Sequence, residues 1–265
     1  MTILSLIILF TLLGGVLSVL AASLFLLLPK AQRTRVLPAM VSFAIGALLG
    51  AAFLAVLPHA LAAPGVRDMH AITGTVLAGL LGFFLLEKLV LWRHCHTHEC
   101  EIHGAETRVP HPTASNTSAA GYLVLVGDGV HNFVDGVLIA AAFLTDVHLG
   151  VVTAVAVAAH EIPQEIGDFA ILLNSGFSRS KALLYNVLSS LTTVVGGILA
   201  YFSLGMAQTA LPYVLAVAAS SFIYIAVADL IPGLHKRLEP RATLEQIILI
   251  GIGVTTIYFA HAALH

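Results

Sequence analysis

The chain has 265 residues, of which 58% are hydrophobic and 10% are charged, and its formal net charge is −2. Its mean hydropathy is +0.97. A soluble domain carries about 25% charged residues, so the composition excludes an ordinary soluble protein and indicates an integral, multi-pass membrane protein.

Eight apolar stretches are long enough to cross a bilayer, which requires about 20 residues each. In chain order they cover approximately 3–28, 37–61, 71–92, 120–144, 149–173, 182–204, 213–234 and 244–263. They fill nearly the whole chain, so we expect one polytopic transmembrane domain over residues 1–265. The predicted fold class is an all-α membrane protein with eight transmembrane helices.

The basic residues predict how these helices are oriented. Eleven of the twelve Lys and Arg residues fall on one side of the predicted bundle, and Arg67 alone falls on the other. Basic loops remain in the cytoplasm, so both termini are expected to be extracytoplasmic. The first span has no basic segment before it and basic residues after it, which favours an uncleaved helix over a signal peptide.

The connection 93–118 is the one long loop, and we expect it to be cytoplasmic, polar and rich in histidine. Its imidazole and thiol groups can bind zinc when they release protons. A metal receiver or sensor at the exit is one interpretation, a solvated polar loop is the other, and a regulatory role is a hypothesis. The candidate ligands are His94, Cys95, His96, His98, Cys100 and His103.

The fourth span carries polar residues at helical spacing. His131 and Asp135 are four residues apart and therefore share a face, with Asn132 beside them. Asp128 lies one turn earlier on that face. An ionisable group at the bilayer centre costs roughly 2.5–3.5 kcal/mol, so such a cluster indicates a shared partner rather than packing.

The fifth span carries a matching set. His160, Gln164 and Asp168 form one stripe, and Glu161 and Glu165 form the adjacent one. Together the two spans offer imidazole nitrogens and carboxylate oxygens, a mixture that suits Zn²⁺ and also Fe²⁺, Mn²⁺ or Cd²⁺. We therefore predict a metal site inside the helix bundle, in which Asp128 and Asp168 orient the ligating imidazoles from behind.

Other histidines lie singly on apolar helices. For His261, near the chain end, we expect a packing role. For His59, which ends the second span, packing and ligation both stay open.

The stretches HNFVDG, from His131 to Gly136, and HEIPQEIGDFAIL, from His160 to Leu172, resemble the signatures of the ZIP family of metal transporters. The second is especially similar to the LIV-type subfamily. Supporting similarity extends over essentially the whole chain, including Leu57-Pro58-His59-Ala60 at the end of the second span.

The resemblance implies eight transmembrane helices with both termini outside, metal uptake toward the cytosol with zinc as the usual substrate, and one helix bundle sliding against another. It also implies a first metal site on His131, Asp135, His160 and Gln164, a second on Asn132, Glu161 and shared carboxylates, and Asp229 on the exit path. This sequence departs from the family pattern at Gln164, where relatives carry His or Glu, and at Thr193, where some prokaryotic members place a bridging Glu.

The predicted function is transport of divalent metal cations, most of all zinc, into the cytosol by alternating access. Two alternatives stay open: a carrier of another cation that uses these residues as a proton relay, and a membrane metal sensor without flux. A metalloprotease would need H-E-x-x-H, and the second His is missing here. The sequence contains no phosphate-binding loop of the kind that an ATPase needs. We therefore expect that the chain is not an enzyme.

We expect no prosthetic group, because the metal is the transported substrate. The expected partners are divalent metal ions and the lipid bilayer, without nucleic acid, and a homodimer is left open. The short connections favour a bacterial inner membrane.

Overall fold

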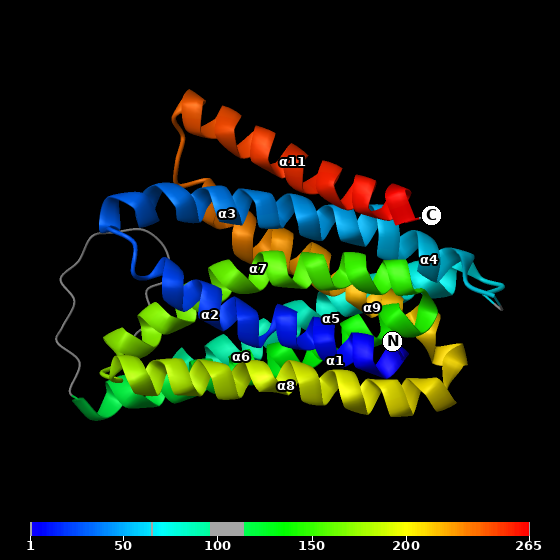
Figure 1. Cartoon of the computed structure of the whole chain (residues 1–265), viewed down its shortest axis with the longest axis horizontal. Helices are drawn as coiled ribbons and strands as arrows, with labels where there is room; N and C mark the ends of the chain where they lie inside the picture. Colours follow the sequence, from blue (N-terminus) through cyan, green and yellow to red (C-terminus); the bar gives the residue numbers. More distant parts are fainter. Residues whose placement is uncertain (1, 65, 96–113, 265) are drawn as a thin grey trace.

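The computed structural model describes residues 2–64, 66–95 and 114–264. Within these residues the chain is helical and contains no strand (Figure 1). The elements are α1 (Ile3–Gly14), α2 (Val16–Phe25), α3 (Lys30–Gly50), η1 (Ala51–Val56), α4 (Leu57–Ala62), α5 (Met69–Cys95), α6 (Ala114–Thr145), α7 (Val147–Asn174), α8 (Arg179–Met206), η2 (Gln208–Ala210), α9 (Leu211–Tyr224), η3 (Ile225–Leu230), α10 (Ile231–Leu234) and α11 (Pro240–Leu264).

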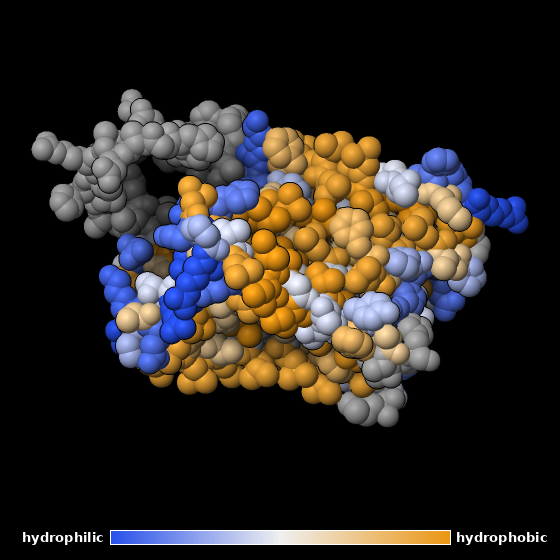
Figure 2. Space-filling view, turned by 90° about the horizontal axis from the view of Figure 1, so that it is seen from above, coloured by the Kyte–Doolittle hydropathy of each residue, from blue (hydrophilic) through white to orange (hydrophobic). Residues whose placement is uncertain are grey.

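Seven helical spans among the described residues are long and apolar enough to cross a membrane. The eighth expected span corresponds to α7, which has 28 residues and therefore sufficient length. Its hydropathy is lowered by the polar residues that the sequence predicted as metal ligands. Figure 2 shows apolar side chains over the middle of one face and hydrophilic ones toward its two ends, as expected for a bilayer-spanning protein.

The structure differs from the predicted spans at two places. The first span divides at Gly15, where the backbone passes so close to α8 that an added Cβ would lie 2.7 Å from the carbonyl oxygen of Ser190. The loop predicted over 93–118 is helical at both ends, since α5 continues to Cys95 and α6 begins at Ala114.

Two spans change to π-helical geometry in their middle. In η1 the N–H of Leu57 bonds to the carbonyl of Ala52, and after η3 the N–H of Ile231 bonds to that of Ala226, five residues back in each case. Each π-helical segment ends two residues before a proline, Pro58 or Pro232. In a regular α-helix a proline lacks the N–H and clashes with the carbonyl four residues back. The π turns therefore accommodate these prolines within continuous helices.

The helices form two packed groups. The first bundle consists of α1, α2, α6, α7 and α8. Its helices α1, α2, α7 and α8 contact one another, and α1, α7 and α8 also contact α6. In the second bundle α3 packs on α11, and α9 packs on α5, η1 and α4. Contacts of α3 and η1 with α7, and of α6 with α9, join the two bundles. Both signature motifs lie in the first bundle.

Candidate metal site

The candidate metal site is formed where α6 and α7 face each other. His131 and Asp135 occupy successive turns of α6, and His160 and Glu161 follow each other on α7. One ligand atom from each of these four residues lies within 4.8 Å of all the others. Among the described residues this is the only group of His, Cys, Asp and Glu that converges so closely.

Several of the ligand-atom separations are close to those around a tetrahedral metal ion, while His131 Nε2 and Asp135 Oδ2 are 3.8 Å apart. The Nε2 atoms of His131 and His160 are 3.4 Å apart. His131 Nε2 lies 3.2 Å from Glu161 Oε1, and His160 Nε2 lies 3.2 Å from Asp135 Oδ2. Two ligands at about 2.0–2.1 Å from one tetrahedral zinc lie about 3.3 Å apart, so these pairs already have the separation that zinc requires.

A backbone carbonyl fixes which nitrogen of His160 can bind a metal. His160 Nδ1 lies 3.1 Å from the carbonyl oxygen of Ala156, one turn earlier on α7. Because a carbonyl only accepts, Nδ1 carries the proton and donates it there, and the lone pair is left on Nε2. Nε2 is the nitrogen that faces Asp135 and Glu161.

The two carboxylates of the group are buried. The side chains of Asp135 and Glu161 are at most 1% exposed, and no hydrogen bond from the described residues reaches their oxygens. Their close polar neighbours are the imidazole nitrogens. Buried carboxylates are costly unless paired or bound to a metal, so the arrangement is suited to a cation.

Asn132 lies beside this group in a network of its own. Its amide nitrogen donates to Asp128 Oδ1 over 2.9 Å, and its oxygen accepts from the Thr193 hydroxyl over 2.7 Å. The network ties α6 to α8 and therefore fixes the face that α6 turns toward α7. In the sequence Thr193 stands out only as a departure from the family pattern. The available signal was the polar stretch Ser189-Ser190-Leu191-Thr192-Thr193 within this span.

A cavity of about 530 Å³ adjoins the site on one side. It is lined by His131 and His160 and by four of the predicted polar residues, Asp128, Gln164, Asp168 and Asp229. On α6 the cavity is lined by His131 and residues before it, and on α7 by His160 and residues after it. Because α6 and α7 run antiparallel, the cavity extends from the site in one direction only. That direction leads to the end of the molecule where α3 and α8 begin.

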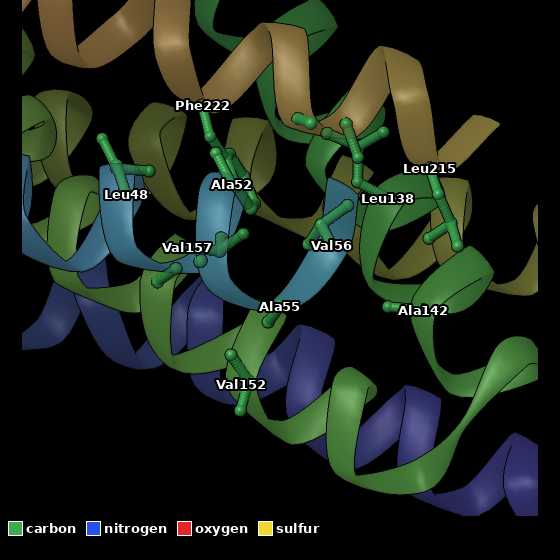
Figure 3. Packing of buried hydrophobic residues seen from close by; sticks show 14 of the residues in the cluster. Leu48, Ala52, Ala55, Val56, Leu138, Ala142, Val152, Val157, Leu215 and Phe222 are labelled. Carbon is green, nitrogen blue, oxygen red and sulfur yellow. The ribbon is translucent and has the colours of Figure 1, made fainter. Parts of the chain in front are cut away.

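On the opposite side an apolar seal covers the site. It consists of buried residues of α3, η1, α6, α7 and α9 that touch one another (Figure 3): Leu48, Ala52, Ala55, Val56, Leu138, Ala142, Val152, Val157, Leu215 and Phe222. Of the two histidines that line the cavity, His131 is 24% exposed and His160 is 1% exposed.

The remaining predicted ligands do not join the four-residue group. Gln164 and Asp229 line the cavity, and Glu165 is fully buried behind it with no hydrogen bond from the described residues to its carboxylate. The structure thus brings Glu161, not Gln164, into contact with His131, Asp135 and His160. His94 and Cys95 end α5, and His96, His98, Cys100 and His103 lie outside the described residues.

The family model described as ZIP zinc transporter matches residues 92–261, which is more than half of the chain. The chain belongs to the ZIP family. The family predicted from the two motifs is therefore confirmed. Since ZIP proteins are transporters, the prediction that the chain is not an enzyme is confirmed as well.

Curated relatives agree with this assignment. Zinc transporter ZIP13 of Pongo abelii is 34% identical over 232 residues, which cover 81% of this chain and 64% of that protein. Zinc transporter ZIP13 of Danio rerio is 32% identical, with 81% of this chain and 74% of that protein covered. Zinc transporter ZIP4 of Homo sapiens is 31% identical, with 78% of this chain and 40% of that protein covered. The chain thus spans between two fifths and three quarters of the length of these relatives.

Proposed function

We propose that this chain carries Zn²⁺ across a membrane into the cytosol and that His131, Asp135, His160 and Glu161 hold the ion in transit. The observation that carries the proposal is the convergence of their four ligand atoms within 4.8 Å. The two carboxylates neutralise the charge of a divalent cation, and the two neutral imidazoles add nitrogen ligands. They also match the nitrogen and oxygen ligands that zinc accepts.

The absence of a cysteine from this group supports a transport role. Structural zinc sites are typically closed by thiolates, whereas a carrier must bind its ion firmly enough to load and weakly enough to release. The partly exposed His131 and the adjoining cavity supply the release route, along which Gln164, Asp168 and Asp229 offer further oxygen atoms.

We place the cavity on the cytoplasmic side. The α3 and α8 ends toward which it extends begin with Lys30 and Arg179, and basic residues remain in the cytoplasm. Both termini are then extracytoplasmic, and the apolar seal faces outward. On this proposal the cavity opens to the cytosol.

Alternating access then requires the seal to open and the cavity to close. The four residues of the site all belong to the first bundle. The second bundle contributes α3 to the lining of the cavity, and α3, η1 and α9 to the seal. Movement of the first bundle against the second would carry the ion from one side of this contact to the other. Small residues such as Ala52 and Ala55 on η1 let the two bundles approach closely at this contact.

The test is zinc flux into proteoliposomes with Fe²⁺, Mn²⁺ and Cd²⁺ as competitors. Saturable uptake that exceeds that of protein-free liposomes is expected, and the order of competition identifies the preferred ion. Binding without flux by folded, inserted protein would instead indicate a metal sensor. Flux of protons or another cation without zinc would indicate the proton-relay alternative.

A further inference from the structure

An apolar groove of about 560 Å³ lies between α6 and α8, separate from the cavity that adjoins the metal site. Figure 1 shows α8 along one edge of the molecule, and α6 packs on it. The lining of the groove begins at Tyr122 on α6 and Tyr185 on α8, and it ends at Phe133 and Val195. Lining side chains such as that of Leu188 are more than half exposed, so the groove opens to the outside of the bundle, where the lipid lies.

The length of the groove corresponds to one leaflet of a bilayer. Tyr122 and Phe133 are eleven residues apart, or about 16.5 Å at 1.5 Å per residue. The hydrocarbon core of a bilayer is about 30 Å thick, so one leaflet takes up about 15 Å. An acyl chain of one leaflet can therefore lie along the whole groove.

The walls of the groove suit a hydrocarbon chain. Ser189 and Thr192 are among its lining residues, but their hydroxyl groups donate to the carbonyl oxygens of Leu125 and Gly129 over 3.3 and 2.7 Å. Because these hydroxyl groups are satisfied within the helix pair, the surface left to the groove is mostly hydrocarbon.

Aromatic side chains mark the end of the groove at which α8 begins. The ring centroids of Tyr122 and Tyr185 are 6.2 Å apart, and they lie 5.2 and 5.8 Å from that of Phe177, which precedes α8. Tyrosines are enriched at the membrane–water interface, where the ring faces the acyl chains and the hydroxyl group faces the headgroups. This end is also the one that we place in the cytoplasm.

Lys181 lies on the groove side of α8, one turn before Tyr185. Positions 181, 185, 188, 192 and 195 follow one another at intervals of three or four residues and therefore share one helix face, and the last four line the groove. Lys181 is exposed, and α8 contains no Asp or Glu. Among the described residues Arg241 is the one lysine or arginine that forms an ion pair with a carboxylate, so the Lys181 ammonium group has no such partner there.

We infer that the groove between α6 and α8 binds an anionic phospholipid, with one acyl chain along the groove and the phosphate at Lys181 and the hydroxyl groups of Tyr122 and Tyr185. An apolar groove alone would accept the chain of any lipid, whereas a lysine at its headgroup end selects an anionic one. The binding of lipid does not rest on the proposed transport function. Only the choice of the cytoplasmic leaflet follows from the orientation proposed above.

The experiment is native mass spectrometry of the full chain in detergent, titrated with phosphatidylglycerol or with phosphatidylcholine of the same acyl chains. Lys181→Gln removes the charge at the end of the groove. Arg179→Gln is the matched control, because Arg179 is exposed in the same turn but lies about 200° around α8 from Lys181. Leu188→Trp narrows the groove, and Leu199→Trp is its control, since these leucines are 52% and 55% exposed and Leu199 lies outside the groove.

Wild type is expected to bind phosphatidylglycerol about fivefold more tightly than phosphatidylcholine, the preference that about 1 kcal/mol from one lysine provides. Lys181→Gln should abolish this preference, and Arg179→Gln should keep it. Leu188→Trp should weaken the binding of both lipids, and Leu199→Trp should leave both unchanged.

An equal loss of preference in the two charge variants would indicate general attraction to a basic surface and would overturn the inference. Unchanged lipid binding by Leu188→Trp would do the same. A dimer of wild type that Leu188→Trp dissociates would assign the groove to a second copy of the chain instead. Should Leu188→Trp not fold, Val126→Trp narrows the groove from α6 and must give the same loss.

Discussion

The Thr193 hydroxyl donates a hydrogen bond to the Asn132 side-chain oxygen over 2.7 Å, and this contact joins α8 to α6 beside the metal site. Asn132 in turn donates to Asp128. The three residues are buried. Their network sets the rotation of the helix that carries His131 and Asp135.

We predict that Thr193→Val destabilises the protein by about 1 kcal/mol, because a buried amide oxygen loses its donor. Thr193→Ser keeps a hydroxyl and is the matched control. Thermal unfolding in detergent measures the difference. Equal melting temperatures for the valine and serine variants would show that the network does not hold α6 in place.

We predict that Asp135→Asn and Glu161→Gln each lower zinc affinity at least 10- to 100-fold. That is the typical loss when a residue that only supports a metal ligand is replaced, and the loss of a ligand should be no smaller. Each change removes a negative charge and keeps the size of the side chain. The measurement is the concentration dependence of zinc uptake. Glu245→Gln, at an exposed carboxylate paired with Arg241, should leave uptake unchanged. A similar loss in all three variants would point to a general effect on folding.

Close contact between α6 and α8 depends on glycine. A Cβ on Gly136 would overlap the carbonyl of Thr193, and one on Gly196 would overlap that of Phe133. We predict that Gly136→Ala costs about 1–3 kcal/mol, because the two backbones must separate. Gly205→Ala, near the end of α8 where nothing lies within 4 Å, should be neutral or stabilising. The yield of monodisperse protein and its melting temperature distinguish the two.

Access to the site can be tested with single cysteines after Cys95→Ser and Cys100→Ser. Gly167 lines the cavity, and a side chain added there meets nothing within 4 Å, whereas Ala55 is fully buried in the seal. Without zinc, Gly167→Cys should react with an impermeant maleimide from the cytoplasmic side only, and Ala55→Cys from neither side. Labelling of Gly167→Cys from the outer side alone would reverse the proposed orientation.

Much of this arrangement could be predicted from the sequence. The apolar stretches match the helices, and the spacing of His131 to Asp135 placed both on one face of α6. The choice of Glu161 over Gln164 beside them could not be predicted. It depends on how α7 is rotated against α6, which is a result of packing with α8 and α3 rather than of spacing along one helix.

The remaining differences also have tertiary causes. Gly15, where the first span divides, lies against the Ser190 carbonyl on α8, and no local pattern contains this contact. The prolines at 58 and 232 indicated irregular helices, but a π turn is one of several ways to accommodate a proline. The ring contact of His59 with His261 joins residues about 200 positions apart in the chain, which no single-helix pattern contains.

The most direct test of the central claim is zinc uptake by His131→Ala with His160→Ala, in protein that inserts and melts like wild type. His235→Ala, an exposed histidine on α10's C-terminal side, is the control. The account predicts that saturable uptake disappears in the double variant and persists in the control. Wild-type uptake by a correctly folded double variant would contradict it, since zinc would then cross without the two imidazoles that lie 3.4 Å apart.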